Sequence, residues 1–157
     1  MKICILALAV ALSFVACNTS VYKTQELDLS SHQFLLKVQA PEGASVTIDS
    51  LGSMIEMVIK KEDQNFLLKI IKQETLPSHT VASLKAESVK EKSMNAGFKI
   101  IEEQPDGYVY EIDWLNNSKN YNFFKAKIEQ NITYTFYGDI LGVLTKEQAT
   151  GLYNCLK

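Results

Sequence analysis

The sequence contains no arginine: all 16 of its basic residues are lysine. Arginine supplies a planar fork that holds phosphate or carboxylate through two parallel hydrogen bonds, and lysine does not reproduce that geometry. The net charge is -2, and the longest basic run is the pair Lys60-Lys61. A nucleic-acid-binding domain needs a basic stripe that neutralises backbone phosphates. The sequence therefore argues against nucleic acid as a partner.

Residues that bind metals or act as nucleophiles are scarce as well. The two histidines, His32 and His79, have no Cys, Asp or Glu at the spacing of a metal site. The sequence has no Gly-rich phosphate loop, no nucleophile elbow and no C-x-x-C pair. We therefore predict a protein that is not an enzyme and that carries no metal and no cofactor.

Two pairs of neighbouring carboxylates are the candidates for acid-base catalysis in this sequence. Glu102-Glu103 form one pair and Glu111 with Asp113 form another, and close carboxylates can separate their pKa values. Glu111 and Asp113, however, alternate with the apolar residues of a predicted strand. That alternation favours a solvated sheet face over a catalytic pair.

The three cysteines are too few for a disulfide framework. Cys4 lies in the apolar N-terminal run, so a chain cut before Cys17 would keep Cys17 and Cys155. One bridge between those two is then possible. Cys155 falls beside Leu152 and Leu156 in a predicted helix, and this setting favours a buried free thiol.

The opening sequence MKICILALAVALSFVAC is an apolar run that follows a single lysine. Fourteen helical residues from Ile3 to Ala16 would reach about 21 Å, short of a hydrocarbon core of about 30 Å. A positive start, a short apolar centre and small residues at the end are typical of a secretory signal peptide.

The last residues of that run resemble the lipobox of bacterial lipoproteins. Val15, Ala16 and Cys17 match its pattern, and Phe14 replaces the usual leucine. The resemblance implies removal of residues 1–16 and lipidation of Cys17, which would anchor the chain in a membrane. Several acyl chains give a lasting anchor where one would not. The alternative is an ordinary signal peptide with an incidental cysteine.

The polar residues that follow set the expected domain organisation. Residues 17–31 predict a lipidated N-terminus and a polar tether, and residues 32–157 predict a single domain, as the chain length suggests. No acidic run follows Cys17, which favours an outer-membrane anchor that faces the periplasm.

Two-residue alternation dominates both halves of residues 32–157. In the first half it aligns Phe34 with Leu36 and Val38, Ile55 with Met57 and Ile59, and Phe66 with Leu68 and Ile70. These segments predict a meander of three or four antiparallel strands.

A helix and a second group of strands are predicted after Pro77. Residues 78–97 favour a helix, with Ser78 or Thr80 as its N-cap and Gly97 as its stop. The strands that follow include a short turn at Gln130-Asn131. Thr145 and Gln148 fit the capping box of a C-terminal helix.

This element order predicts an α+β fold with a largely antiparallel sheet of about six to seven strands flanked by two helices. The segments FLLKVQAPEG, GFKIIEEQPDGYVYEIDW and IEQNITYTFYGDILGVLTKEQATGLYNCL resemble the PsbP-like α-β-α sandwich over residues 32–157. That fold mostly serves binding and assembly, so the resemblance implies no catalytic residue.

Most aromatic residues of the chain fall between Tyr108 and Tyr137. Some of them must be core, and the rest could line a groove for a protein partner or an apolar ligand. The candidate binding surface consists of Tyr108, Tyr110, Trp114, Tyr121 and Phe123.

The expected function is that of a membrane-anchored lipoprotein of the bacterial cell envelope, acting as a non-enzymatic binding or assembly module for another envelope protein. The alternative is a carrier of a small apolar ligand. A closed cavity lined by Tyr110, Trp114 and Phe136 would favour the carrier.

Overall fold

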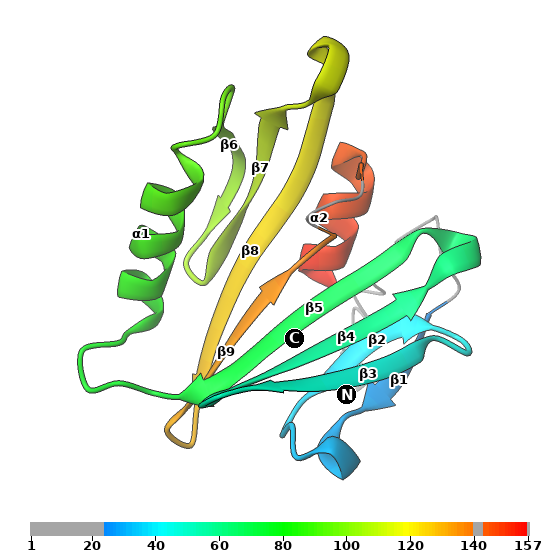
Figure 1. Cartoon of the computed structure of the whole chain (residues 1–157), viewed down its shortest axis with the longest axis vertical. Coiled ribbons are helices and arrows are strands. Elements are labelled where there is room, and N and C mark those ends of the chain that lie inside the picture. The colour runs from blue at the N-terminus through cyan, green and yellow to red at the C-terminus, as the bar shows by residue number, and fades with distance from the viewer. Residues whose placement is uncertain (1–23, 140–142, 157) are drawn as a thin grey trace, which may run out of the picture.

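The computed structural model describes residues 24–139 and 143–156, which fold as an α+β domain (Figure 1). Its helices are α1 (Val81–Lys92) and α2 (Lys146–Asn154). Its strands are β1 (Thr24–Asp28), β2 (Lys37–Pro41), β3 (Ser45–Leu51), β4 (Met54–Lys61), β5 (Phe66–Glu74), β6 (Lys99–Gln104), β7 (Gly107–Asp113), β8 (Lys119–Glu129) and β9 (Ile132–Tyr137).

Seven of the strands form one antiparallel sheet in the order β3-β4-β5-β9-β8-β7-β6. β1 and β2 pair separately as a two-stranded sheet. The two helices lie on opposite sides of β8 (Figure 1), α1 on one side and α2 on the other. The predicted fold class, with its seven-stranded sheet and two helices, is confirmed.

Each face of the sheet has its own apolar core. On the α1 side, a small core packs Tyr108, Tyr110, Phe124 and Ala126 against Leu84 of the helix. On the α2 side, a larger core joins the sheet to α2 and to the β1–β2 hairpin. That core includes Phe34, Val38, Met57, Ile59, Phe66, Leu68, Ile70, Phe123, Tyr134, Phe136, Leu152 and Tyr153. The predicted inward faces of β4 and β5 are therefore confirmed.

Local capping and turn signals determine several element ends. Thr80 and Ser83 form a reciprocal capping box at α1, and Thr145 and Gln148 form one at α2. Gln130 and Asn131 both have positive φ, as a two-residue type I′ hairpin turn requires. Both caps and this turn stand where the sequence predicts them, with Thr80 rather than Ser78 as the cap.

The predicted boundary between tether and domain is wrong. Residues 24–31, assigned above to the tether, contain β1 and the buried Leu29. Leu27 lies opposite Val38 in the β1–β2 pair, so this segment is part of the α2-side core. β2 was also expected in the main meander, yet its apolar face packs onto the sheet instead of extending it. In the sequence, the alternation of Leu27 and Leu29 with polar residues was the signal that this segment forms a strand with one buried face.

The expectation of a free thiol at Cys155 is also wrong. Cys155 is the C-cap residue of α2, it is buried, and it is disulfide-bonded. The other two cysteines of the chain, Cys4 and Cys17, lie outside the described residues. The structure therefore gives Cys155 a covalent role in place of a packing role.

Gly107 offers a test of how closely β7, β8 and α2 pack. A Cβ atom there would lie 2.1 Å from the carbonyl oxygen of Phe124 and 2.9 Å from the Tyr153 ring. Gly107→Ala should lower the free energy of unfolding by about 3 kcal/mol, since backbone must move. Urea unfolding measures this loss.

Gly52→Ala is the matched control. Gly52 has a φ of 66° but nothing within 4 Å of an added Cβ, so only the left-handed backbone opposes the change, at a cost of roughly 1 kcal/mol. Equal losses in the two variants would contradict the packing described for Gly107.

Candidate functional site

The five aromatic residues predicted as a binding surface do not share one face. Tyr108 and Tyr110 of β7 are buried under α1, whereas Phe123 of β8 is buried on the α2 side, where Tyr121 also packs. Trp114 is half-buried after the end of β7. The structure therefore separates this set between the two cores.

The aromatic residues on the α1 side are close-packed. The ring of Tyr108 lies 5.6 Å from those of Tyr110 and Phe124, and Phe124 lies 5.7 Å from Tyr137. Such centroid distances are typical of favourable aromatic pairs. Phe136 belongs to the core on the opposite face, so Tyr110 and Phe136 do not line a common cavity.

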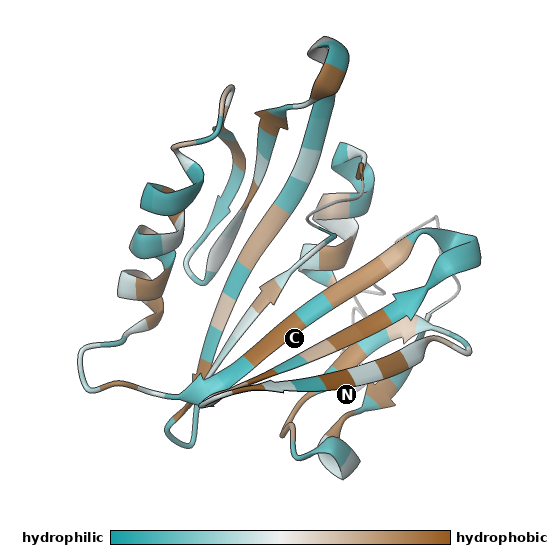
Figure 2. Ribbon diagram, in the orientation of Figure 1, coloured by the Kyte–Doolittle hydropathy of each residue, from teal (hydrophilic) through white to brown (hydrophobic). Residues whose placement is uncertain are grey.

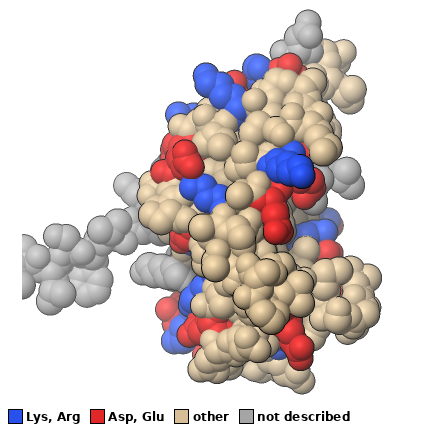
Figure 3. All heavy atoms as spheres, turned by 90° about the vertical axis from the view of Figure 1, so that its left-hand side faces the viewer, with Lys and Arg blue, Asp and Glu red and all other residues tan. Residues whose placement is uncertain are grey.

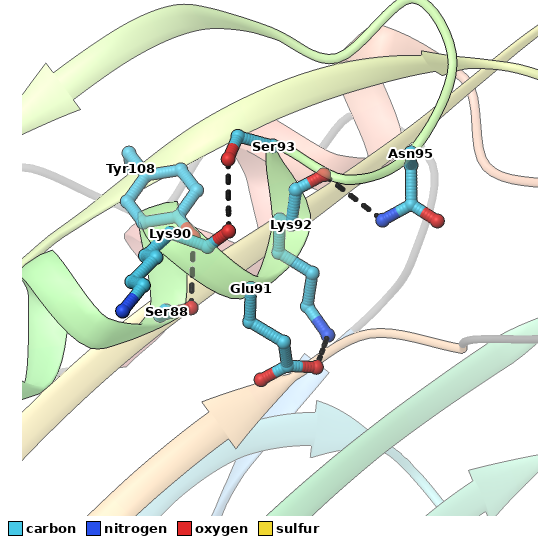
Figure 4. A network of polar contacts seen from close by, with 7 residues as sticks. All are labelled: Ser88, Lys90, Glu91, Lys92, Ser93, Asn95 and Tyr108. Carbon is cyan, nitrogen blue, oxygen red and sulfur yellow. Dashed lines mark hydrogen bonds and ion pairs between the residues drawn. The ribbon is translucent and has the colours of Figure 1, made fainter.

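One hydrogen bond joins this aromatic core to α1 (Figure 4). The hydroxyl groups of Ser88 and Tyr108 lie 2.8 Å apart and both side chains are buried. Burial raises the pKa of Tyr108 to about 12, and the hydrogen bond with Ser88 opposes that rise. Burial also raises the pKa values of Tyr110 and Tyr137. Polar contacts and packing together fix the helix on this half of the sheet.

The C-terminal end of α1 is held by side chains that satisfy its last carbonyls (Figure 4). Ser93 Oγ donates to the carbonyl of Lys90 and Asn95 Nδ2 donates to that of Lys92. Lys92 pairs with Glu91 at 2.8 Å and its Nζ lies 5.9 Å from the centre of the Tyr137 ring. These contacts stabilise the helix edge that faces β9 and β5.

Among the described residues, no element covers the α1 side of β3, β4 and β5 as α1 covers β7 and β8. Met57 and Ile59, which lie on the α2 side of the sheet, are fully buried, but their neighbour Val58 on the other face is only half-buried. Met54, also on that face, is 38% exposed. Figure 2 shows hydrophobic residues along β4 and β5, interrupted by hydrophilic ones. Half of the α1 side of the sheet is therefore open.

A groove of about 230 Å³ runs between α1 and this open half. Met54 and Ile71 of the sheet and Tyr137 of β9 supply its apolar wall. Leu84, Glu87 and Glu91 supply the wall on α1, and His79 lines it from the loop before the helix. We call this the α1 groove.

Some polar groups in and beside the α1 groove are paired within the molecule. Glu56 and Lys69, on the same open half, form a half-buried ion pair at 3.0 Å, and Glu91 pairs with Lys92. His79 Nδ1 is buried without a hydrogen-bond partner in the described chain. In Figure 3, which faces the α1 side, basic and acidic side chains are interspersed. The groove is thus lined by both apolar and polar side chains, among them a buried imidazole nitrogen that has no partner within the described chain.

A larger pocket of about 550 Å³ lies on the α2 side, between the β1–β2 hairpin and the end of β8. Its charged residues include Lys37 and Lys127, which are paired at 2.8 Å with Glu26 and at 2.7 Å with Glu129. Cys155 also lines it, so it adjoins the disulfide. We do not assign it to a ligand because its lysines are already neutralised.

Within residues 24–139 and 143–156, no three His, Cys, Asp or Glu residues come together as a metal site. No α-helix in this described part is both long enough and apolar enough to cross a bilayer. His32 is exposed, and Glu111 and Asp113 both lie near Lys119.

A scan against protein-family models, a search of curated proteins and a search of solved structures each found no match to the chain. The resemblances to a lipobox and to the PsbP-like fold therefore stay predictions.

The α1 groove was not predicted, although β5 carried a signal for it. In FLLKIIKQE, apolar residues fall on both faces, with Phe66, Leu68 and Ile70 on one side and Leu67 and Ile71 on the other. A strand that is apolar on both faces is expected to be covered on both faces or to bind something.

The buried tyrosines predict a specific loss of stability in alkali. Below pH 10, folded and unfolded chains both keep their tyrosine protons, so this contribution is complete. As the pH rises from about 10 through about 12, the unfolded chain releases protons that folded Tyr108 retains. The free energy of unfolding should then fall by up to about 1.4 kcal/mol per pH unit for each such tyrosine.

Urea unfolding between about pH 9 and pH 12 checks this, with tyrosinate absorbance read in parallel. Tyr108→Phe removes one of the retained protons, so the free energy of unfolding should fall less steeply with pH in this variant. Full titration of all tyrosines near pH 10 in a chain that is still folded would contradict the packing of this core.

Proposed function

We propose that the chain is a lipid-anchored protein of the bacterial cell envelope whose domain binds another envelope protein and catalyses no reaction of its own. The uncovered half of the α1 side carries the binding part of this proposal. It leaves Met54, Val58 and Ile71 partly exposed beside a formed groove, and exposed apolar surface next to a rigid helix is typical of a protein-binding site.

The anchor part of the proposal is supported by the N-terminal sequence and by the start of the domain. β1 begins at Thr24, seven positions after Cys17. Seven extended residues span about 23 Å. A lipid on Cys17 would therefore hold the domain close to the membrane surface, on a tether shorter than the sequence alone indicated.

Metabolic labelling with palmitate tests the anchor. We expect the wild-type chain to incorporate label and Cys17→Ala to incorporate none, while Cys155→Ala, the matched control, labels normally. An unlabelled wild-type chain would contradict the anchor.

Photocrosslinking in intact cells tests the binding site. A photoreactive residue in place of Glu87, on the wall of the α1 groove, should capture a specific envelope protein. The same residue in place of Leu115, which is highly exposed after β7, is the control and should capture none. Met54→Lys should reduce the captured amount roughly tenfold, since a charge would replace apolar contact.

Two results would overturn the binding role. The first is equal capture from Glu87 and Leu115. The second is capture of small molecules alone, which would favour the apolar-ligand carrier.

A further inference from the structure

The two edges of the seven-stranded sheet differ in how they are protected. Every edge strand presents unpaired N–H and C=O groups, and proteins block such edges with charges, bulges, prolines or covering elements. β6, at one edge, has a bulge between Ile100 and Glu102. Lys85 of α1 pairs with Glu103 at 2.8 Å and donates to the carbonyl of Gln104 at 2.7 Å. This edge is blocked.

Within residues 24–139 and 143–156, β3, at the other edge, has none of these devices. Its seven residues SVTIDSL pair with β4 in continuous register, without a bulge. The strand contains no lysine and no proline, and Asp49 is its one charge. Residues 47–51 are all exposed, including Ile48 at 40% and Leu51 at 54%. In Figure 1, β3 is the outermost strand of its half of the sheet.

We propose that β3 pairs with β3 of a second copy of this chain, in antiparallel fashion about a two-fold axis at Ile48, so that the two sheets become one. An isologous contact of this kind is the commonest form of dimer interface. The backbone groups of one edge satisfy those of the other, as in strand addition.

The sequence of β3 is complementary to itself in this register. The two-fold axis places Ile48 opposite Ile48, Thr47 opposite Asp49, Val46 opposite Ser50, and Ser45 opposite Leu51. No two carboxylates lie directly opposite, which would be destabilising. Ile48 lies opposite Met57 of β4 in the same chain, so the paired isoleucines extend the α2-side apolar face across the interface. This fit favours a second copy over a foreign strand.

Disulfide trapping in cells, with the full-length chain, tests the register. Directly opposed residues of antiparallel strands have Cα atoms about 5 Å apart, within the range of a disulfide. Ile48→Cys should therefore give a covalent dimer under mild oxidation. In the same pairing the two copies of Leu51 lie six residues apart, about 20 Å, so Leu51→Cys is the matched control and should give none beyond the wild-type background.

Sedimentation equilibrium of the purified full-length chain tests the interface without crosslinking. Ile48→Lys would place two ammonium groups opposite each other and should raise the dimer dissociation constant at least tenfold. Met94→Lys alters a residue that is 81% exposed and remote from β3, and it should leave dimerisation unchanged. Unchanged melting temperatures would establish that both variants are folded.

Three results would overturn the proposal: a wild-type chain that stays monomeric at the highest concentration measured, equal crosslinking through positions 48 and 51, or a crosslink from position 48 that joins another protein. All three are independent of capture at the α1 groove, so this proposal can fail while the proposed function stands.

Discussion

The main sheet is seven strands wide, and this width determines how each of its two faces is covered. Seven strands spaced about 4.8 Å apart span about 29 Å, whereas one helix with its side chains covers about 10 Å. On the α2 side, α2 and the β1–β2 hairpin together cover the sheet, and Met57, Ile59 and Ile70 are fully buried. On the α1 side a single 12-residue helix covers only the β7–β8 half. In the part of the chain that the structure describes, one half of this face is therefore left uncovered.

The open half explains why the candidate surfaces lie where they do. It contains β3, β4 and β5, so the α1 groove and the unblocked edge of β3 belong to the same half of the sheet. The other half is closed by the Ser88–Tyr108 hydrogen bond, the packed aromatic rings and the charges on β6. Packing, polar contacts and edge protection are thus concentrated on one half, and the accessible apolar surface is concentrated on the other.

The sequence predicted what depends on local pattern and missed what depends on packing between distant segments. Alternation identified the inward faces of β4 and β5, and a capping box identified Thr145, whereas Ser78 and Thr80 were both candidates for the cap of α1. The same alternation could not tell that β2 pairs with β1 rather than with β3, since a strand has period two in any sheet. It also could not assign Tyr108 and Phe123 to opposite cores, because that depends on strand register. The width of sheet left uncovered by α1 is likewise a tertiary property.

The position of β1 relates the proposed anchor to the proposed binding surfaces. β1 pairs with β2, and this hairpin packs on the α2 side of the sheet. A lipid attached seven residues before β1 would therefore approach the domain from the β1–β2 hairpin and hold the α2 side toward the membrane. The α1 groove lies on the opposite face, so anchoring would leave it accessible.

The proposed dimer is compatible with this orientation. Two antiparallel β3 strands are related by a two-fold axis perpendicular to the sheet, so the α2 sides of both copies lie on the same side of the joined sheet. Both lipids of a dimer could then enter one membrane, and both grooves would face away from it.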